Sequence, residues 1–196
     1  MNEQLRPTSM PFTTQAAEGR RFTVAEIESM AAKGILAEDE RLELIGGELV
    51  PMSPKGTRHE RIHTELAFQM TRLAPETLRV ASEAQPNLAD DAYAMPAILV
   101  YPASIKVDRV RGPATLLVIE IADGSLAYDL NTKADLYAGY GVREYCVVDG
   151  RTMETKVHRD PSAAGYGSVA DVPSSDRLVP QAAPELAVLL SSLDLD

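Results

Sequence analysis

One strand-like run and the helix expected after it carry residues that could do chemistry together. Glu120 interrupts the apolar run "LLVIEIAD" near its end, and Asp129, Lys133 and Tyr137 follow at intervals of four residues. A helix would place these last three on one face. A strand-end carboxylate can hold a divalent cation, and a nearby ammonium can orient an attacking water and offset charge on a phosphate. These groups fit metal-assisted hydrolysis of a phosphodiester bond.

Each of these residues also has an ordinary structural explanation. Taken alone, Glu120 fits an exposed strand end as well as it fits a site. Asp129 and Lys133 have the spacing of a surface ion pair, which contributes only a few tenths of a kcal/mol to stability. The hypothesis therefore depends on the combination of strand and helix.

The elements that must position these residues are a strand, a helix and a second strand. Residues 114–123 form a continuous apolar run of the kind buried on both faces of a sheet. Residues 126–141 predict a helix ending at Gly141, and "VREYCVVDG" directly after it predicts a strand. This order indicates a βαβ unit with a parallel pair, and open α/β sheets bind ligands at the carboxyl ends of such strands.

The remaining elements follow from local signals. Thr23 and Glu26 have the capping-box spacing at the start of a short helix that stops at Gly34. Gly46-Gly47 predicts a two-residue β-hairpin. The other expected elements are an amphipathic helix over 59–74, strands over 77–84, 95–101, 153–160 and 176–180 with a loop between the last two, and an apolar helix over 184–196. We therefore expect an α/β (α+β) fold in which helices flank a mixed sheet, preceded by a helix and a hairpin.

The composition is that of an ordinary globular protein. Its 196 residues, 45% hydrophobic and 24% charged, fit one domain over 21–196 after a flexible lead-in over 1–20. No apolar run reaches the roughly 18 residues of a membrane span, and the N-terminus lacks a secretory apolar region, so we expect a cytoplasmic protein without a membrane partner. The single cysteine, Cys146, excludes a Cys-rich zinc site. The net charge of −10 disfavours non-specific binding of nucleic acid.

In this order of elements the chain resembles the restriction-endonuclease family of Uma-type nucleases, within the PD-(D/E)xK nuclease superfamily. The most specific piece is "LLVIEIADGSLAYDLNTKADLYAGYGVREYCVVD"; "FTVAEIESM", "RLELIGGELVPMSPKGTRHERI" and "MPAILVYP" precede it in the family's order. The resemblance implies a restriction-endonuclease-like fold and a DNA endonuclease that uses Mg²⁺ or Mn²⁺. It implies Glu120 as a metal ligand and Lys133, placed on the helix after the strand, as the contact to water and phosphate. Asp129 and Tyr137 become candidate substrate contacts.

Two N-terminal positions are carried over by the same resemblance. Glu48, after the hairpin glycines, is implied as a second catalytic and metal-binding carboxylate, and His59 as a substrate contact. From the residues alone, a solvent-facing position in the hairpin explains Glu48 almost as well, and a surface position explains His59. His63, one turn after His59, has no counterpart in the family pattern.

The chain departs from the family pattern at residue 97. Family members usually have Pro-Asp where this chain has Pro96-Ala97, and the Asp resembles a metal ligand beside the strand glutamate. Alanine supplies no ligand atom, so we expect a Mg²⁺ or Mn²⁺ ion to bind weakly. Two functions stay open: a metal-dependent endonuclease whose activity is weak or lost, and a catalytically degenerate nuclease fold that binds DNA or protein.

Contacts to DNA are expected from a few scattered basic residues. Arg58, Arg61, Arg109 and Arg111 are the candidates for phosphate contacts, although solvated surface charge explains each of them alone. The oligomeric state also stays open. Endonucleases that cut both strands are commonly two-fold homodimers, and a homodimer would suit the exposed edge of a mixed sheet.

Overall fold

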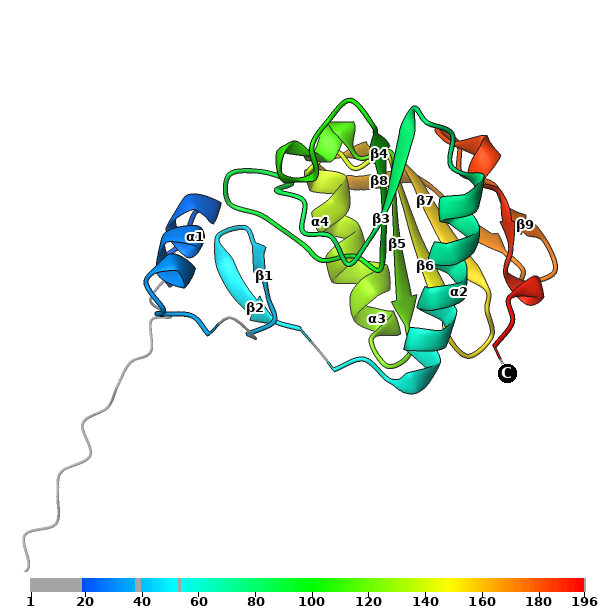
Figure 1. Cartoon of the computed structure of the whole chain (residues 1–196), viewed down its shortest axis with the longest axis horizontal. Coiled ribbons are helices and arrows are strands. Elements are labelled where there is room, and N and C mark those ends of the chain that lie inside the picture. The colour runs from blue at the N-terminus through cyan, green and yellow to red at the C-terminus, as the bar shows by residue number, and fades with distance from the viewer. Residues whose placement is uncertain (1–18, 38–39, 53, 196) are drawn as a thin grey trace, which may run out of the picture.

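A mixed sheet forms the centre of the structure (Figure 1). The computed structural model describes residues 19–37, 40–52 and 54–195, so the lead-in expected over 1–20 lies outside the described residues except for its last two. The sheet has six strands in the order β3-β4-β5-β6-β7-β8. Their bounds are β3 (Leu78–Ser82), β4 (Ile98–Pro102), β5 (Leu117–Ala122), β6 (Glu144–Asp149), β7 (Thr155–Ser162) and β8 (Gly165–Val172). β5 and β6 run parallel, and the other neighbours in this sheet run antiparallel.

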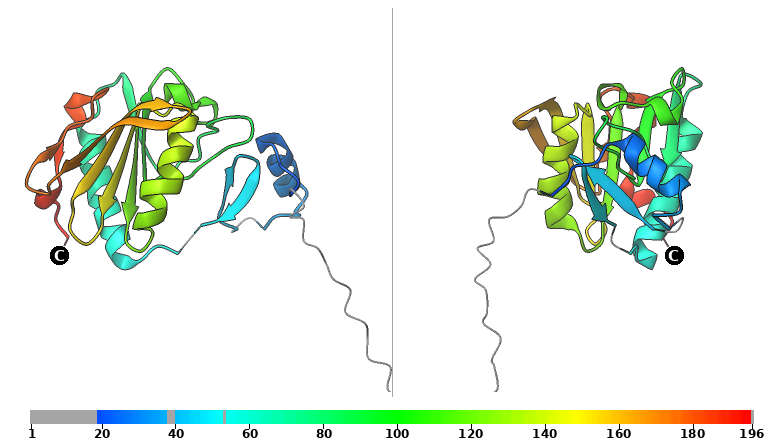
Figure 2. Two further views of the ribbon diagram at one scale, coloured as in Figure 1. Left: turned by 180° about the vertical axis from the view of Figure 1, so that it is seen from behind. Right: turned by 90° about the vertical axis from the view of Figure 1, so that its left-hand side faces the viewer.

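Helices cover both faces of this sheet (Figure 2). α2 (Thr57–Leu73) packs residues such as Leu66 against one face, and α4 (Ala134–Gly139) packs Tyr137 against the other. Successive side chains of β5 therefore point to opposite helices, as the pleat requires. β4, β5 and β6 are buried over nearly their whole length, which confirms the strands expected from continuous apolar runs.

The predicted βαβ unit is present between β5 and β6. Its helical part consists of α3 (Leu126–Tyr128), a π-helical turn (Asp129–Lys133) and α4, where the sequence predicted one regular helix. Gly141 follows α4 with a φ of 79°, the left-handed conformation expected of a helix-ending glycine. A π-helical turn inside an α-helix often occurs at a functional site. Here it contains two of the candidate site residues.

The short helix near the N-terminus is also present. α1 (Val24–Ala32) begins with both hydrogen bonds of the predicted capping box, made between Thr23 and Glu26. Its buried side chains pack against the β-hairpin that follows. α1 therefore supports the hairpin rather than the main sheet.

The hairpin consists of β1 (Leu42–Ile45) and β2 (Glu48–Pro51), joined by the predicted two-residue turn. Gly46 and Gly47 have φ values of 55° and 82°, which a type I′ turn requires. Reciprocal backbone hydrogen bonds of 3.1 and 3.0 Å between Leu44 and Tyr93 tie the hairpin to the segment before β4. This connection holds β1 beside the end of the main sheet where β5 finishes.

The prediction of a loop after β7 is wrong, because residues 165–172 form β8. β8 pairs antiparallel with β7 from Gly165, opposite Ser162, to Val172, opposite Thr155. Most of β8 is exposed, and its glycine, serine and alanine residues show no apolar alternation. The strand forms through backbone pairing with β7 across the short turn at residues 163–164, and the side-chain composition of the segment does not report this pairing.

The helix expected over 184–196 is also wrong. Two 3₁₀ turns (Pro184–Leu186 and Leu190–Ser192) flank β10 (Val188–Leu189), which pairs with β9 (Arg177–Leu178). Three of the side chains that this segment buries in the α2 core, Leu186, Val188 and Leu190, recur at every second residue, and Leu193 follows three residues later. That period fits extended chain better than helix.

The predicted fold class is confirmed: a mixed sheet flanked by helices, with a helix and a hairpin ahead of it. Within the described residues, no helix combines the length and the apolar character that crossing a membrane requires.

Candidate active site

A cleft of about 710 Å³ lies where the hairpin, the start of α2, the end of β5 and the π-helical turn meet. Its charged and titratable lining side chains are Glu43, Lys55, His59, Glu120, Asp123, Tyr128, Asp129 and Lys133. Four of the residues singled out in the sequence, His59, Glu120, Asp129 and Lys133, therefore line one cleft.

Two glutamates and a lysine form a buried charged centre in this cleft. Lys133 Nζ lies 2.8 Å from Glu120 Oε1 and 3.4 Å from Glu43 Oε1. Tyr137 donates from its hydroxyl to the same Glu120 oxygen at 3.2 Å. The three members Glu43, Glu120 and Lys133, called the charged centre below, are 3%, 7% and 8% exposed, so these contacts are made largely out of water.

The charges of this centre fix its protonation. Burial by itself would lower the pKa of Lys133, but the Glu120 and Glu43 carboxylates outweigh burial and raise that pKa above its ordinary value. Burial, with the neighbouring carboxylates, also raises the pKa of the Tyr137 hydroxyl. Lys133 is therefore a permanent cation and Tyr137 a neutral donor at any physiological pH.

Asp129 lies in the same cleft without an ion pair to Lys133 among the described residues. Its carboxylate accepts a hydrogen bond from the Ser125 hydroxyl, and its side chain is buried. Burial raises the pKa of Asp129 to about 6, although the Ser125 hydrogen bond acts in the opposite direction. Asp129 is therefore a carboxylate that can exchange a proton near neutral pH.

His59 also faces the cleft, from the first turn of α2. Burial and the neighbouring Lys55 lower the pKa of His59, which keeps its imidazole neutral at pH 7. Its Nδ1 atom is buried and has no hydrogen-bond partner in the described part of the chain. The imidazole therefore has one nitrogen available to a substrate or an ion.

Glu48 does not lie in the cleft. Its carboxylate is 65% exposed and lies 3.7 Å from Arg21. Both Glu43 and Glu48 point to the same face of the hairpin, because Ile45 pairs with Glu48 and Glu43 lies two residues before Ile45. Glu48 stands at the turn, farther from the main sheet. The expected role of Glu48 as a ligand gains no support from this position.

Glu43 is the functional candidate that sequence reasoning missed. It lies between two leucines in a short apolar strand, as Glu120 lies between two isoleucines. A single carboxylate inside an apolar strand is the sequence signal for such a residue. The prediction applied this signal to Glu120 but not to Glu43. The Met95 backbone N–H donates to Glu43 Oε1 at 3.0 Å, which holds the carboxylate toward the cleft.

Ala97 lies directly beside the charged centre. It precedes β4, and since Ile98 pairs with Ile119, residue 97 is opposite Glu120. The Ala97 backbone N–H lies 3.4 Å from Glu120 Oε2, and its side chain is buried. The contact to Glu120 comes from the backbone of residue 97, and the alanine side chain, which packs in the core cluster beneath α2, supplies no oxygen donor.

Other charged side chains considered from the sequence, which do not line the cleft, contact other parts of the protein. Asp90, in the loop before Ala97, lies 3.2 Å from Arg111 and does not line the cleft. Arg58 donates to the backbone oxygens of residues 150 and 151, and Arg61 donates to the Leu195 carbonyl at 3.0 Å. Three of the four guanidinium groups expected to contact phosphate, those of Arg58, Arg61 and Arg111, thus hold segments of the protein together.

Comparison with known proteins gives a family and a fold. Residues 24–194 match the Uma2 family model, described as "Putative restriction endonuclease". A crystal structure described as "a putative nuclease belonging to DUF820", from Anabaena variabilis, superposes with a TM-score of 0.68. The match covers 88% of this chain and 97% of that one at 18% sequence identity, a level that supports a shared fold. No curated protein sequence matches the chain. Because the family model spans most of its length, the chain belongs to the Uma2 family.

Proposed function

We propose that this protein hydrolyses phosphodiester bonds of DNA with the help of a divalent cation, at a rate limited by the alanine at position 97. One observation carries the proposal: the buried Lys133 ammonium lies between the carboxylates of Glu43 and Glu120 in an open cleft. Burying two carboxylates and an ammonium carries a desolvation penalty that can exceed their mutual attraction, so stability alone does not explain this group. Membership of the Uma2 family supports the same reaction class.

The donor set suits a hard cation such as Mg²⁺ or Mn²⁺. Glu43 and Glu120 offer carboxylate oxygens, and Asp129 lines the same cleft. Mg²⁺ in proteins is commonly held by one or two carboxylates together with substrate phosphates and water. When bound, such a cation would polarise the phosphate and lower the pKa of a water molecule. Residue 97 would supply none of its ligands.

The protein's own groups have distinct proposed roles around the phosphate. Lys133 stays protonated and would donate to a phosphate oxygen or to the attacking water. Tyr137 holds Glu120 in position through its hydroxyl. Asp129, with a pKa of about 6, would be deprotonated at neutral pH and able to accept a proton from water.

A second function is favoured by Ala97 itself. With no ligand at position 97, Lys133 alone balances much of the negative charge of Glu43 and Glu120. A fold stabilised in this way without a metal could serve only to bind DNA or another protein. The two functions differ in whether the native protein already binds a divalent cation and cleaves DNA, or does so only when a carboxylate is restored at position 97.

Ala97→Asp tests this choice. The added carboxylate should raise Mn²⁺ affinity and plasmid cleavage by at least about tenfold, because it completes the set of oxygen donors. Without metal the variant should lose about 3 kcal/mol of unfolding free energy, since a further charge is buried beside Glu120. Binding is measured by calorimetry, cleavage with supercoiled plasmid, and stability by urea unfolding with and without Mg²⁺.

Ala97→Asn is the matched control, because the asparagine side chain has nearly the same shape as aspartate but no charge. It should leave metal binding and cleavage near the native level. Native protein that cleaves as fast as Ala97→Asp would show that position 97 limits nothing. Cleavage that survives Lys133→Ala would exclude the charged centre as the site of reaction.

A further inference from the structure

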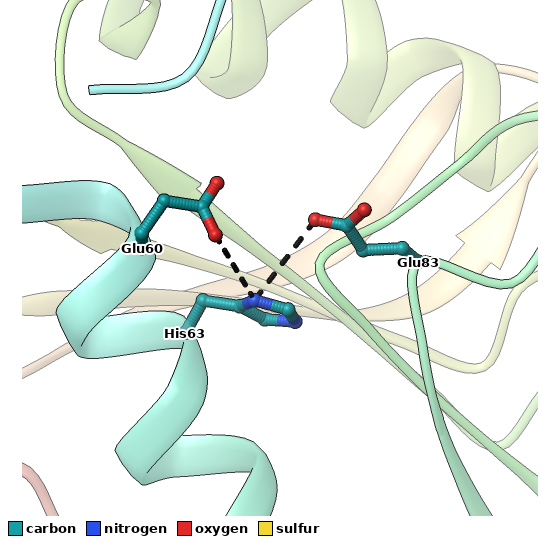
Figure 3. A group of neighbouring side chains, drawn as sticks. All are labelled: Glu60, His63 and Glu83. Atoms are coloured by element: carbon teal, nitrogen blue, oxygen red, sulfur yellow. Dashed lines mark ion pairs between the residues drawn. The ribbon is translucent and has the colours of Figure 1, made fainter. Parts of the chain in front are cut away.

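A group of side chains whose donor atoms could hold a metal ion lies beside the cleft, apart from the charged centre. Glu60 and His63 are three residues apart on α2, and Glu83 follows directly after β3 (Figure 3). One ligand atom from each lies within 4.8 Å of the others. His63 Nδ1 is 4.0 Å from a Glu60 oxygen and 4.0 Å from a Glu83 oxygen, so both carboxylates face the same ring nitrogen.

The far side of the His63 ring is already held as in a metal-binding histidine. His63 Nε2 lies 3.1 Å from the Ser82 hydroxyl. In the tautomer that carries its proton on Nε2, His63 donates to Ser82 and turns the Nδ1 lone pair toward the two carboxylates. Metal-ligating histidines usually donate their other N–H in this way, which fixes the tautomer and the ring orientation.

His59 supplies an independent observation that points to a ligand. Its side chain is 9% exposed, and Nδ1 has no hydrogen-bond partner among the described residues. This atom lies 3.6 Å from Glu60 Oε1, while the other Glu60 oxygen faces His63. A buried polar atom without a partner costs about 1–3 kcal/mol, so a ligand at this place would account for it.

We propose that Glu60, His63 and Glu83 form a binding site for Zn²⁺, with His59 as the fourth ligand. Zn²⁺ binds imidazole nitrogen and carboxylate oxygen at about 2.0–2.2 Å, which places the ligand atoms of a tetrahedron about 3.3–3.6 Å apart. The ligand atoms of Glu60, His63 and Glu83 lie within 4.8 Å of one another, and Glu60, whose side chain is 49% exposed, can move to close the gap. His59 lies outside this group and would join it through Nδ1, which faces Glu60. The imidazole donors favour Zn²⁺ over Mg²⁺, in contrast to the all-oxygen donors of the charged centre.

Lys55 is the competitor for this site. Its ammonium forms an ion pair with the same Glu83 oxygen that faces His63, and Arg41 lies 3.8 Å from the other oxygen. Zn²⁺ would displace Lys55, whose side chain also lines the cleft. The Glu83 backbone N–H donates to the Ala97 carbonyl at 3.3 Å. Zn²⁺ would therefore join α2 to the segment that contacts residue 97.

The test is a Zn²⁺ titration of the untagged full chain against a chromophoric chelator, with the melting temperature measured in parallel. The native chain should bind one Zn²⁺ and melt at a higher temperature with it. His63→Gln, Glu83→Gln and Glu60→Gln should each weaken binding by about tenfold or more. Glu76→Gln, an exposed carboxylate before β3, should stay within about twofold, and Lys55→Met should bind more tightly.

The site is distinct from the charged centre, so Glu120→Gln should keep the native Zn²⁺ affinity. Loss of Zn²⁺ binding in Glu120→Gln, equal losses in Glu76→Gln, or no binding by the native chain would each overturn the proposal. If His63→Gln does not fold, the Zn²⁺ affinity of Glu60→Gln is the deciding measurement, because Glu60 is half-exposed. An affinity equal to the native value contradicts the site, and a tenfold loss supports it.

Discussion

At the scale of single residues, the charged centre is built from side chains that rarely occur inside a protein unpaired. Glu43 and Glu120 are both buried, and Lys133 and backbone N–H groups from residues 95 and 97 satisfy their oxygens. Removing one member of a buried ion pair leaves an uncompensated charge. Each of the three residues therefore affects stability as well as any reaction, and variants must be judged on both.

The two glutamates of the hairpin make a matched pair of variants. Glu43 lines the cleft and Glu48 is exposed at the turn. In the Ala97→Asp protein, Glu43→Gln should weaken Mn²⁺ binding by about tenfold or more, and Glu48→Gln should change it by less than about twofold. Calorimetry measures both. A larger loss for Glu48→Gln would return the ligand role to Glu48.

Asp129 predicts a dependence of stability on pH. Its pKa is raised from 3.8 to about 6, so it adds stability below the unfolded pKa that is lost as the pH rises through about 6. Asp129→Asn keeps an acceptor for Ser125 but cannot ionise. Relative to the native protein, the variant should gain about 3 kcal/mol of unfolding free energy between about pH 4 and pH 8.

Urea unfolding of both proteins across this pH range measures the difference. A difference that stays flat with pH would show that Asp129 titrates normally. Asp135→Asn, which removes an exposed carboxylate from the same helical segment, is the control.

At the scale of elements, the π-helical turn and the hairpin position the side chains of the charged centre. The π-helical turn buries Asp129 and Lys133 next to the end of β5. The hairpin, held by its contacts to Tyr93, brings Glu43 from the opposite side. The hairpin's geometry depends on a tight turn, so the turn should control how well Glu43 reaches Lys133.

Gly47→Ala tests the hairpin as a unit. Gly47 has a φ of 82°, and an added Cβ would lie 2.7 Å from the Arg21 Cβ. The variant should lose about 1–2 kcal/mol from the left-handed conformation alone, and the clash should add to this. Hydrogen exchange should rise in the hairpin while the main sheet stays protected.

Gly139→Ala is the opposite case and serves as the control. Gly139 lies in α4 with no atom within 4 Å of an added Cβ, so alanine should stabilise the protein by about 0.5–1 kcal/mol. Equal effects of the two substitutions would mean that the turn does not require glycine.

At the scale of the whole molecule, the net charge and its distribution affect the affinity of the protein for DNA. The net charge is −10, and Arg58, Arg61 and Arg111 already bind backbone oxygens of the protein. Three of the four arginines expected to contact phosphate are therefore already engaged within the protein. The proposed endonuclease must rely on the cleft and a bound metal more than on a basic surface.

This predicts a weak salt dependence of DNA binding. In the absence of divalent metal, the slope of log affinity against log salt for a short duplex should be smaller in magnitude than about 2, which corresponds to about two phosphate contacts. Fluorescence anisotropy measures it. Arg58→Ala and Arg111→Ala should leave the slope unchanged. A slope near −6 would reveal a basic DNA-binding surface.

Local signals in the sequence were enough to predict the centre of the fold. Continuous apolar runs gave β4, β5 and β6, and the capping box and Gly46-Gly47 gave α1 and the hairpin. Lys133 and Tyr137, singled out by their four-residue spacing after Glu120, both contact Glu120, because the strand and the helical segment behind it are close in sequence.

Only the tertiary structure decided the rest, because it depends on pairing between distant segments. The C-terminal segment is extended where it packs on α2. β8 is the local exception, because it pairs with β7 across a two-residue turn but carries no apolar pattern that predicts a strand. Glu43 rather than Glu48 enters the cleft because Leu44 is bonded to Tyr93, about 50 residues away. Glu83 meets His63 for the same kind of reason, since no local pattern reports which side chains two separate elements bring together.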